Sequence, residues 1–205
     1  MNLEKTDFEG VGGTLDYYER NAEEFVRGTA DVDFSEIQNR FLDRLEAGSL
    51  ILDFGCGSGR DTKYFLKRGY RVDAIDGSEE LCRLASAYTG VKVRRMLFQE
   101  LSAVDMYDGI WACASILHLP EAEVGNVIRK MANALKERGI IYTSFKYGTF
   151  AGERNGRFFT DMTEEKFARL MQCVGGLVME EQWISKDARP ERNEDRWLNL
   201  ILRKE

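Results

Sequence analysis

The sequence predicts an α/β domain in which helices cover both faces of a mostly parallel β-sheet. Short apolar runs suited to buried strands alternate with helical segments between residues 50 and 145. A glycine-rich turn, Gly55–Gly59, directly follows the first of these runs. The chain has 205 residues, 43% of them hydrophobic, which is enough for one domain with a sizeable core.

The elements follow from the spacing of apolar residues. Two amphipathic helices are expected at about 14–27 and 34–46, because apolar side chains recur there at helical spacing. They make residues 1–47 a helical cap on a single domain whose α/β core spans 48–205. Strands are expected in the core at 50–54, 71–75, 91–97, 109–114 and 139–145. Helices are expected at 59–68, 79–87, 121–136 and 163–173.

The C-terminal third no longer follows this alternation of strands and helices. Its two apolar runs, 177–180 and 197–202, are typical of a strand pair. The connection between them, 185–195, is charged and polar, which predicts a surface loop.

Composition excludes several function classes. The formal net charge is −6, whereas duplex nucleic acid calls for a basic face, so we expect no nucleic-acid partner. A single histidine, His118, and four well-separated cysteines predict no metal site. No apolar segment is long enough for a membrane span, and the N-terminus has no secretory signal. We therefore expect a cytoplasmic protein with reduced thiols and no membrane partner. The sequence indicates no particular oligomeric state.

The glycine turn is the strongest indication of a ligand site. Glycines permit positive φ and close backbone approach, and ligands of open α/β sheets bind at the carboxyl ends of the strands. A dinucleotide turn has the pattern G-x-G-x-x-G, but here the glycines are Gly55, Gly57 and Gly59, and Arg60 follows them. A phosphate-binding P-loop is excluded, because no Gly-Lys-Ser/Thr follows. A nucleotide-dependent oxidoreductase is left as a minor alternative.

The spacing D-x-G-x-G-x-G, Asp53 to Gly59, resembles motif I of the class I S-adenosylmethionine-dependent methyltransferases. Asp76, at the end of the second strand, extends the resemblance over both βα units, and the whole similarity covers about 48–146. The resemblance implies a Rossmann-like three-layer sandwich whose seven-stranded, mostly parallel sheet includes an antiparallel C-terminal strand. It also implies S-adenosyl-L-methionine as cofactor and S-adenosyl-L-homocysteine as product.

Roles for individual residues follow from this resemblance. Asp76 would accept hydrogen bonds from both ribose hydroxyls, or would instead serve as a helix N-cap. Backbone at Gly55 and Gly57 would face the methionine end of the cofactor. Asp53 would orient its ammonium group, while Arg60 would reach its carboxylate or remain a solvated helix residue. The expected cofactor residues are Asp53, Gly55, Cys56, Gly57, Ser58, Gly59, Arg60, Asp76, Gly77, Ser78, Phe98, Gln99, Glu100 and Ser115.

The loop after the third strand departs from the family pattern. The family often has an acidic residue there that binds the adenine amino group, whereas this chain has Leu97 and Phe98. We expect backbone near Phe98 and Gln99, or the side chain of Gln99 or Glu100, to make this contact instead.

His118 is the candidate general base, because its ordinary pKa lies near neutrality and it follows the fourth strand. The alternative is that it lines the pocket or hydrogen-bonds a loop. The segment 148–159, glycine-rich and charged, is either a lid that supplies cations or a plain solvated loop. The expected substrate residues are Tyr17, Tyr18, Asn21, His118, Lys146, Tyr147 and Arg157.

The methyl acceptor is expected to be a small molecule, methylated on oxygen, nitrogen or another nucleophile. The motif D/N-P-P-Y/F, which the resemblance links to methylation of bases, is absent, and the acidic charge agrees with its absence. Methylation of a protein or of RNA is an alternative. A non-catalytic protein that binds S-adenosylmethionine as a regulator or partner is another.

Overall fold

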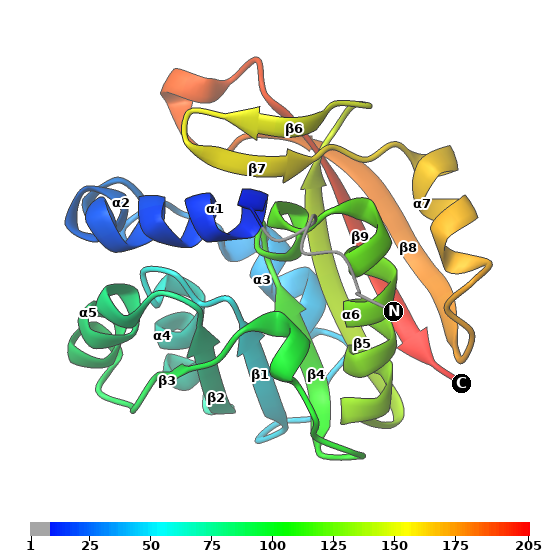
Figure 1. The fold of residues 1–205 in the computed structure, drawn as a ribbon. Coiled ribbons are helices and arrows are strands. Elements are labelled where there is room, and N and C mark those ends of the chain that lie inside the picture. The colour runs from blue at the N-terminus through cyan, green and yellow to red at the C-terminus, as the bar shows by residue number, and fades with distance from the viewer. Residues whose placement is uncertain (1–8) are drawn as a thin grey trace, which may run out of the picture.

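The computed structural model describes residues 9–205 and confirms the predicted fold class (Figure 1). Seven strands form the central sheet: β1 (Leu50–Phe54), β2 (Arg71–Asp76), β3 (Arg94–Arg95), β4 (Tyr107–Ala112), β5 (Leu135–Lys146), β8 (Leu177–Lys186) and β9 (Arg196–Lys204). Their order is β3-β2-β1-β4-β5-β9-β8. The first five are parallel, and β9 runs antiparallel to both of its neighbours.

Helices cover both faces of this sheet. One face carries α3 (Ser35–Leu42), α4 (Arg60–Lys67) and α5 (Glu79–Thr89), and the other carries α6 (Glu121–Ala134) and α7 (Glu164–Met171). Successive side chains of a strand point to opposite faces, so Leu52 and Phe54 of β1 pack toward α6. Ile51, between them, packs toward α3 and α4 together with Trp111 of β4. The sheet is therefore buried on both sides, as its apolar strands require.

The cap differs from its predicted form. The single helix expected at 14–27 is two helices, α1 (Glu9–Arg20) and α2 (Ala22–Thr29). They break at Asn21, whose backbone is not helical and whose side-chain amide donates to the Tyr17 carbonyl at 2.7 Å. The cap is anchored to the core at Glu19, whose carboxylate accepts a hydrogen bond from the Ser78 hydroxyl at 2.6 Å.

The segment 148–159 forms most of a β-hairpin, made by β6 (Ala151–Arg154) and β7 (Arg157–Thr160). Its turn is Asn155-Gly156, both with positive φ, which is the combination that favours tight hairpin turns. The hairpin lies against α1 (Figure 1), and the Phe158 N–H donates to the Thr14 hydroxyl at 2.8 Å. The plain-loop alternative is therefore wrong for this segment.

The observed ends of several other elements also differ from the predicted ones. The third strand, expected at 91–97, is reduced to Arg94–Arg95 at the edge of the sheet, where it has a single neighbour. The strand expected at 177–180 extends to Lys186, so the first part of the expected 185–195 loop is strand. Single-turn 3-10 helices complete the chain: η1 (Phe98–Glu100), η2 (Ile116–His118) and η3 (Pro190–Arg192).

A buried polar network joins α3, α4 and β4 below the glycine turn. The Trp111 ring is fully buried and stacks on Tyr142, with ring centroids 4.0 Å apart. Its indole N–H donates to the Asp61 carboxylate at 2.9 Å. The same carboxylate accepts from the Gln38 amide at 2.6 Å and from the Arg60 guanidinium at 2.8 Å. Asp61 is thus satisfied by donors from three elements.

Trp111→Phe tests this network. The substitution removes the indole donor and leaves a buried carboxylate oxygen of Asp61 with one partner fewer. We expect the free energy of unfolding to fall by about 1–3 kcal/mol in urea denaturation followed by circular dichroism. Trp183→Phe is the matched control, because Trp183 is only partly buried and packs at the edge of the same cluster. Equal losses in the two variants would contradict the role given to the Trp111–Asp61 hydrogen bond.

Candidate functional site

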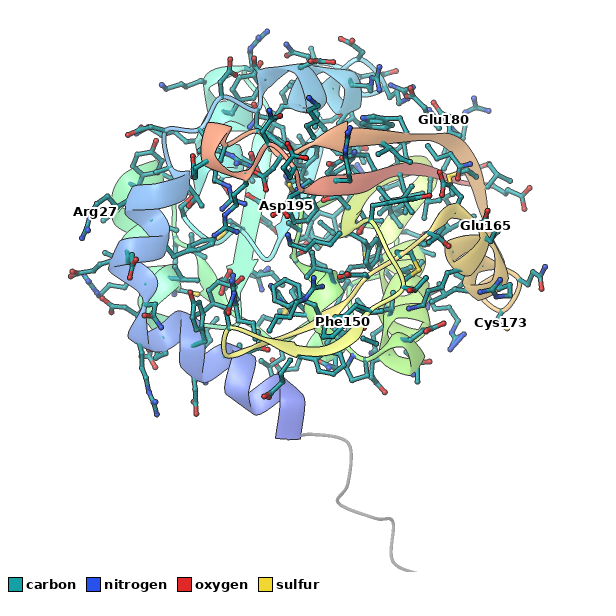
Figure 2. The ribbon with its side chains drawn as sticks, turned by 90° about the horizontal axis from the view of Figure 1, so that it is seen from above. Arg27, Phe150, Glu165, Cys173, Glu180 and Asp195 are labelled. Atoms are coloured by element: carbon teal, nitrogen blue, oxygen red, sulfur yellow. The ribbon has the colours of Figure 1, made fainter. Side chains whose placement is uncertain are left out.

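A cavity of about 810 Å³ opens at the carboxyl ends of the parallel strands. The glycine turn forms its floor, and three covers surround it: the α1–α2 cap, the β6–β7 hairpin and the 185–195 segment. Figure 2 looks down on this edge of the sheet, with Phe150 by the hairpin and Asp195 on the opposite cover. Its volume lies within the range of about 300–1,000 Å³ that is typical of small-molecule sites.

Two glycines of the turn are required by close packing. Gly55 and Gly57 have φ of 86° and 54°. A Cβ on Gly55 would lie 2.6 Å from the Cβ of Ser115, and one on Gly57 would lie 2.9 Å from the Phe25 ring. Such distances leave no room for a side chain, so the backbone itself forms the wall of the cavity.

Asp76 holds the turn in place. One of its carboxylate oxygens accepts from the Gly57 N–H at 2.9 Å, and the other accepts from the Ser78 N–H at 2.9 Å. Burial raises the pKa of Asp76, against the opposing effect of these backbone donors. Ser78 caps α5 by accepting from the Leu81 N–H at 3.1 Å, so the N-cap alternative for Asp76 is wrong. Each Asp76 oxygen keeps a further lone pair for a ligand.

Most of the expected cofactor residues meet at this cavity. Those that line it are Gly55, Cys56, Gly57, Ser58, Arg60, Asp76, Gly77, Phe98, Gln99 and Ser115. Four do not: Asp53, Gly59, Ser78 and Glu100.

These four residues lie outside the lining of the cavity, and each has another place in the fold. Asp53 is buried beneath the turn, where its carboxylate accepts from the Thr62 hydroxyl at 2.5 Å. Burial and the neighbouring Asp61 charge raise the pKa of Asp53. Glu100 accepts from the Leu97 N–H at 2.7 Å, so its side chain is engaged in its own loop. Gly59 begins α4, and Ser78 begins α5.

Arg60 is neither solvated nor free. Its guanidinium pairs with Asp61 at 2.8 Å and lies 4.4 Å over the Phe34 ring. The expectation of a solvated helix residue is therefore wrong. A contact with a cofactor carboxylate stays a prediction, and it would compete with this internal ion pair.

His118 is enclosed by two hydrogen bonds. Its Nδ1 lies 2.7 Å from the Phe158 carbonyl, which can only accept, so Nδ1 carries the hydrogen. Nε2 is then the acceptor for the Tyr18 hydroxyl, 2.9 Å away. Burial lowers the pKa of His118 to about 4. The ring is thus neutral at physiological pH, and it both lines the cavity and binds the hairpin. Its role as general base stays a prediction.

The expected substrate residues divide in two. Tyr18, His118, Lys146 and Arg157 line the cavity. Tyr17 lies behind Arg157, with the guanidinium carbon 4.6 Å from its ring centroid. Asn21 is outside the cavity, because its amide is used at the break between α1 and α2. Tyr147 is also outside, with 39% of its surface exposed.

Sequence reasoning missed part of the cavity wall. The wall also includes Cys113, directly after β4, Ser144 of β5 and Asn199 of β9, together with the 185–195 segment. Ser144 and Asn199 are polar residues within largely apolar strand segments, and this pattern could have indicated that they line a site. The contribution of 185–195 had no signal beyond its charge, because its placement depends on the path of β8 and β9.

Two features are absent from residues 9–205. None of the helices within them is long and apolar enough to cross a bilayer. No three His, Cys, Asp or Glu side chains in this part of the chain are grouped as a metal site would require.

Comparison with known proteins finds similarity to methyltransferases over part of the chain. Residues 51–139 match the family model described as a methyltransferase domain. The ubiquinone biosynthesis O-methyltransferase of Xanthomonas axonopodis pv. citri is 34% identical over 109 residues, which cover 49% of this chain and 45% of that protein. The human N-terminal Xaa-Pro-Lys N-methyltransferase 1 is 33% identical over 101 residues, 45% of each chain. These matches span less than half of either relative.

A solved structure matches over a greater length. The 1,6-didemethyltoxoflavin-N1-methyltransferase of Burkholderia thailandensis, crystallised with 1,6-didemethyltoxoflavin and S-adenosylhomocysteine, superposes with a TM-score of 0.78. The superposition covers 100% of this chain and 92% of that one at 20% sequence identity, which is a likeness of fold. Residues 51–139 thus match a methyltransferase domain, and the glycine turn and the sheet order agree with the fold of the class I S-adenosylmethionine-dependent methyltransferases.

Proposed function

We propose that this protein transfers a methyl group from S-adenosylmethionine to an oxygen, nitrogen or other nucleophile of a small molecule. The observation that carries the proposal is the side-by-side placement of the glycine turn and the Asp76 carboxylate in the lining of one cavity. When bound there, the cofactor would supply an already activated methyl group and leave as S-adenosylhomocysteine.

The residues present suit this cofactor. Gly55 and Gly57 line the cavity without a side chain of their own, so their backbone would be available to the amino-acid moiety of the cofactor. Asp76 retains acceptor capacity for two ribose hydroxyls, and a hydrogen bond to a charged group contributes about 1.5–3 kcal/mol. Phe98 and Gln99 lie on the same wall, where backbone and side chain are available to an adenine.

The covers of the cavity support a small acceptor. The α1–α2 cap is joined to the β6–β7 hairpin by the Thr14–Phe158 hydrogen bond at 2.8 Å, and to His118 of η2 by the Tyr18–His118 hydrogen bond at 2.9 Å. An acceptor would have to fit in the space that these covers leave. The match to an enzyme named as a protein N-terminal methyltransferase keeps a peptide end as the second candidate, because a chain terminus is also slender.

Catalysis would rest mainly on positioning, because the reaction is a single displacement that needs the nucleophile in line. Orientation of this kind supplies about 7–11 kcal/mol at best. Where the nucleophile carries a proton, Tyr18 and His118 form a route for its removal. The Tyr18 oxygen would accept the proton from the acceptor while its own hydrogen passes to His118 Nε2, to which it is already hydrogen-bonded.

Turnover would test the proposed function. The purified protein is incubated with S-adenosylmethionine and a pool of small metabolites, and in parallel with peptides that have free N-termini. We expect S-adenosylhomocysteine to accumulate, together with a metabolite heavier by one methylene. Methylation of the peptides alone would establish the second candidate. Cofactor binding without turnover of either pool would favour a regulatory binding protein.

Asp76→Ala tests the ribose contact. We expect the affinity for S-adenosylhomocysteine, measured by isothermal titration calorimetry, to fall at least tenfold, because the ribose hydroxyls lose a charged acceptor. Asp73→Asn, on the same strand but bonded to Tyr107 outside the cavity, should leave the affinity within about twofold. Melting curves of both ligand-free variants show whether the turn still folds. Unchanged affinity in a folded Asp76→Ala protein, or a thermal shift with NAD alone, would reject this cofactor assignment.

Burial of neutral His118 predicts a pH dependence of stability. Its pKa is about 4 in the fold, against an ordinary value near 6.5, so the unfolded chain binds the proton more strongly between these limits. Stability from this group is complete above pH 6.5 and is lost as the pH falls toward 4. We expect the wild-type protein to lose on the order of 2 kcal/mol more than His118→Gln between pH 6.5 and 4.5. Parallel urea-unfolding profiles for the two proteins would show instead that the ring titrates normally.

A further inference from the structure

Seven cationic side chains of the described residues line the cavity, and the partly buried ones are almost all neutralised by a carboxylate of the protein. Five of them are partly buried: Arg60, Lys146, Arg154, Arg157 and Arg189. Four have an aspartate partner, in the pairs Arg60–Asp61, Lys146–Asp195, Arg154–Asp161 and Arg189–Asp187. Within the part of the chain that the structure describes, Arg157 is the exception, with no carboxylate within 4.0 Å.

Arg157 is held in place by rings rather than by an ion pair. Its guanidinium carbon lies 4.6 Å from the ring centroid of Tyr17, 5.2 Å from that of Phe159 and 5.7 Å from that of Tyr18. Its Nε is buried without a hydrogen-bond partner among the described residues. One terminal nitrogen makes a long contact of 3.4 Å to the Tyr18 hydroxyl oxygen. The aromatic rings contact the faces of the Arg157 guanidinium, so the N–H donors at the edge of the guanidinium remain largely unused.

A partly buried guanidinium with unused donors takes acceptors from solvent or from a ligand in the cavity. The planar fork of an arginine fits a carboxylate through two parallel hydrogen bonds, which a lysine cannot reproduce. The neighbouring wall is aromatic, with Tyr18 and Phe159 both lining the cavity. We propose that Arg157 binds a carboxylate of the methyl acceptor, and that the acceptor is a small organic acid with an apolar or aromatic body. This inference rests on the proposed function.

The methionyl carboxylate of the cofactor is the other possible source of the anion. The contacts around Arg157 favour the acceptor. Arg157 contacts the rings of Tyr17, Tyr18 and Phe159, which belong to α1 and the hairpin. Among the described residues, no hydrogen bond or ion pair joins its guanidinium to the glycine turn.

The test compares acids with their neutral amides. Benzoate and phenylacetate, each against its primary amide, are titrated calorimetrically into the protein with and without saturating S-adenosylhomocysteine. We expect each acid to bind at least tenfold more tightly than its amide. Arg157→Gln should abolish this preference, and Arg157→Lys should restore only part of it, because the charge returns without the fork. Equal affinity of acid and amide in the wild-type protein would overturn the proposal.

The matched control is Arg27→Gln. Arg27 is an exposed cation on α2 that does not line the cavity, and Figure 2 shows it on the outer side of the helix. The acid preference should stay within about twofold of wild type in this variant. If Arg27→Gln and Arg157→Gln lose the acid preference equally, the preference comes from the overall charge of the protein, and the Arg157 site is rejected. Circular dichroism melts of each variant separate a lost contact from a lost fold.

Binding of S-adenosylhomocysteine distinguishes the two proposals. If the wild-type protein does not bind it, the proposed function fails, whereas the titrations without cofactor still decide the Arg157 site. If Arg157→Gln weakens S-adenosylhomocysteine more than tenfold and retains the acid preference, the guanidinium binds the cofactor instead. That result would overturn the assignment of the carboxylate to the acceptor.

Discussion

The candidate site depends on a pair of hydrogen bonds from backbone N–H groups to Asp76. They join the turn after β1 to the turn after β2, because Gly57 donates to one carboxylate oxygen and Ser78 to the other. The Gly55 and Cys56 N–H groups both donate to the Ile75 carbonyl, at 3.0 Å and 2.9 Å, and strengthen the same junction. The cavity-lining backbone is thus positioned by the ends of two adjacent parallel strands.

The roof of the cavity is assembled from segments far apart in the chain. Phe158 of the hairpin takes part in two hydrogen bonds, one from its N–H to Thr14 and one to its carbonyl from His118. His118 in turn accepts from Tyr18 of the cap. This series of donors and acceptors orients the His118 ring, and its burial lowers the pKa so that the ring stays neutral. Exclusion of water by the same roof would strengthen the electrostatic contacts of any ligand held beneath it.

The lower layer of the site has a different physical character. Asp61, Gln38, Arg60 and Trp111 form a compact buried network in which the carboxylate receives donors from α3, α4 and β4. A buried charge of this kind is tolerated only with several donors, and their directions fix the orientation of the helices that supply them. This network leaves Arg60 committed to the protein, while Arg157 on the hairpin has no such partner among the described residues.

Much of the fold and of the candidate site could be predicted from local sequence patterns. Apolar periodicity located the strands of the parallel sheet, and the Gly55–Gly59 spacing with Asp76 predicted where a cofactor would lie. Errors arose where local signals were weak or left unused. The Asn155-Gly156 pair signals a tight hairpin, and the helical periodicity across Asn21 concealed the break between α1 and α2. The third strand shrank because it lies at a sheet edge with one neighbour, which periodicity alone cannot indicate.

The sequence by itself determined the class of fold and the wall that would hold a cofactor, because both rest on residues close together in the chain or at the ends of adjacent strands. Only the tertiary structure decided which side chains are free to meet a ligand. His118, Arg60 and Lys146 are candidates in the sequence, yet each is engaged by a residue that only the fold identifies as its partner: Tyr18, Asp61 and Asp195. The availability of a polar group depends on which donors and acceptors folding brings to it, and that choice is made by packing between distant segments.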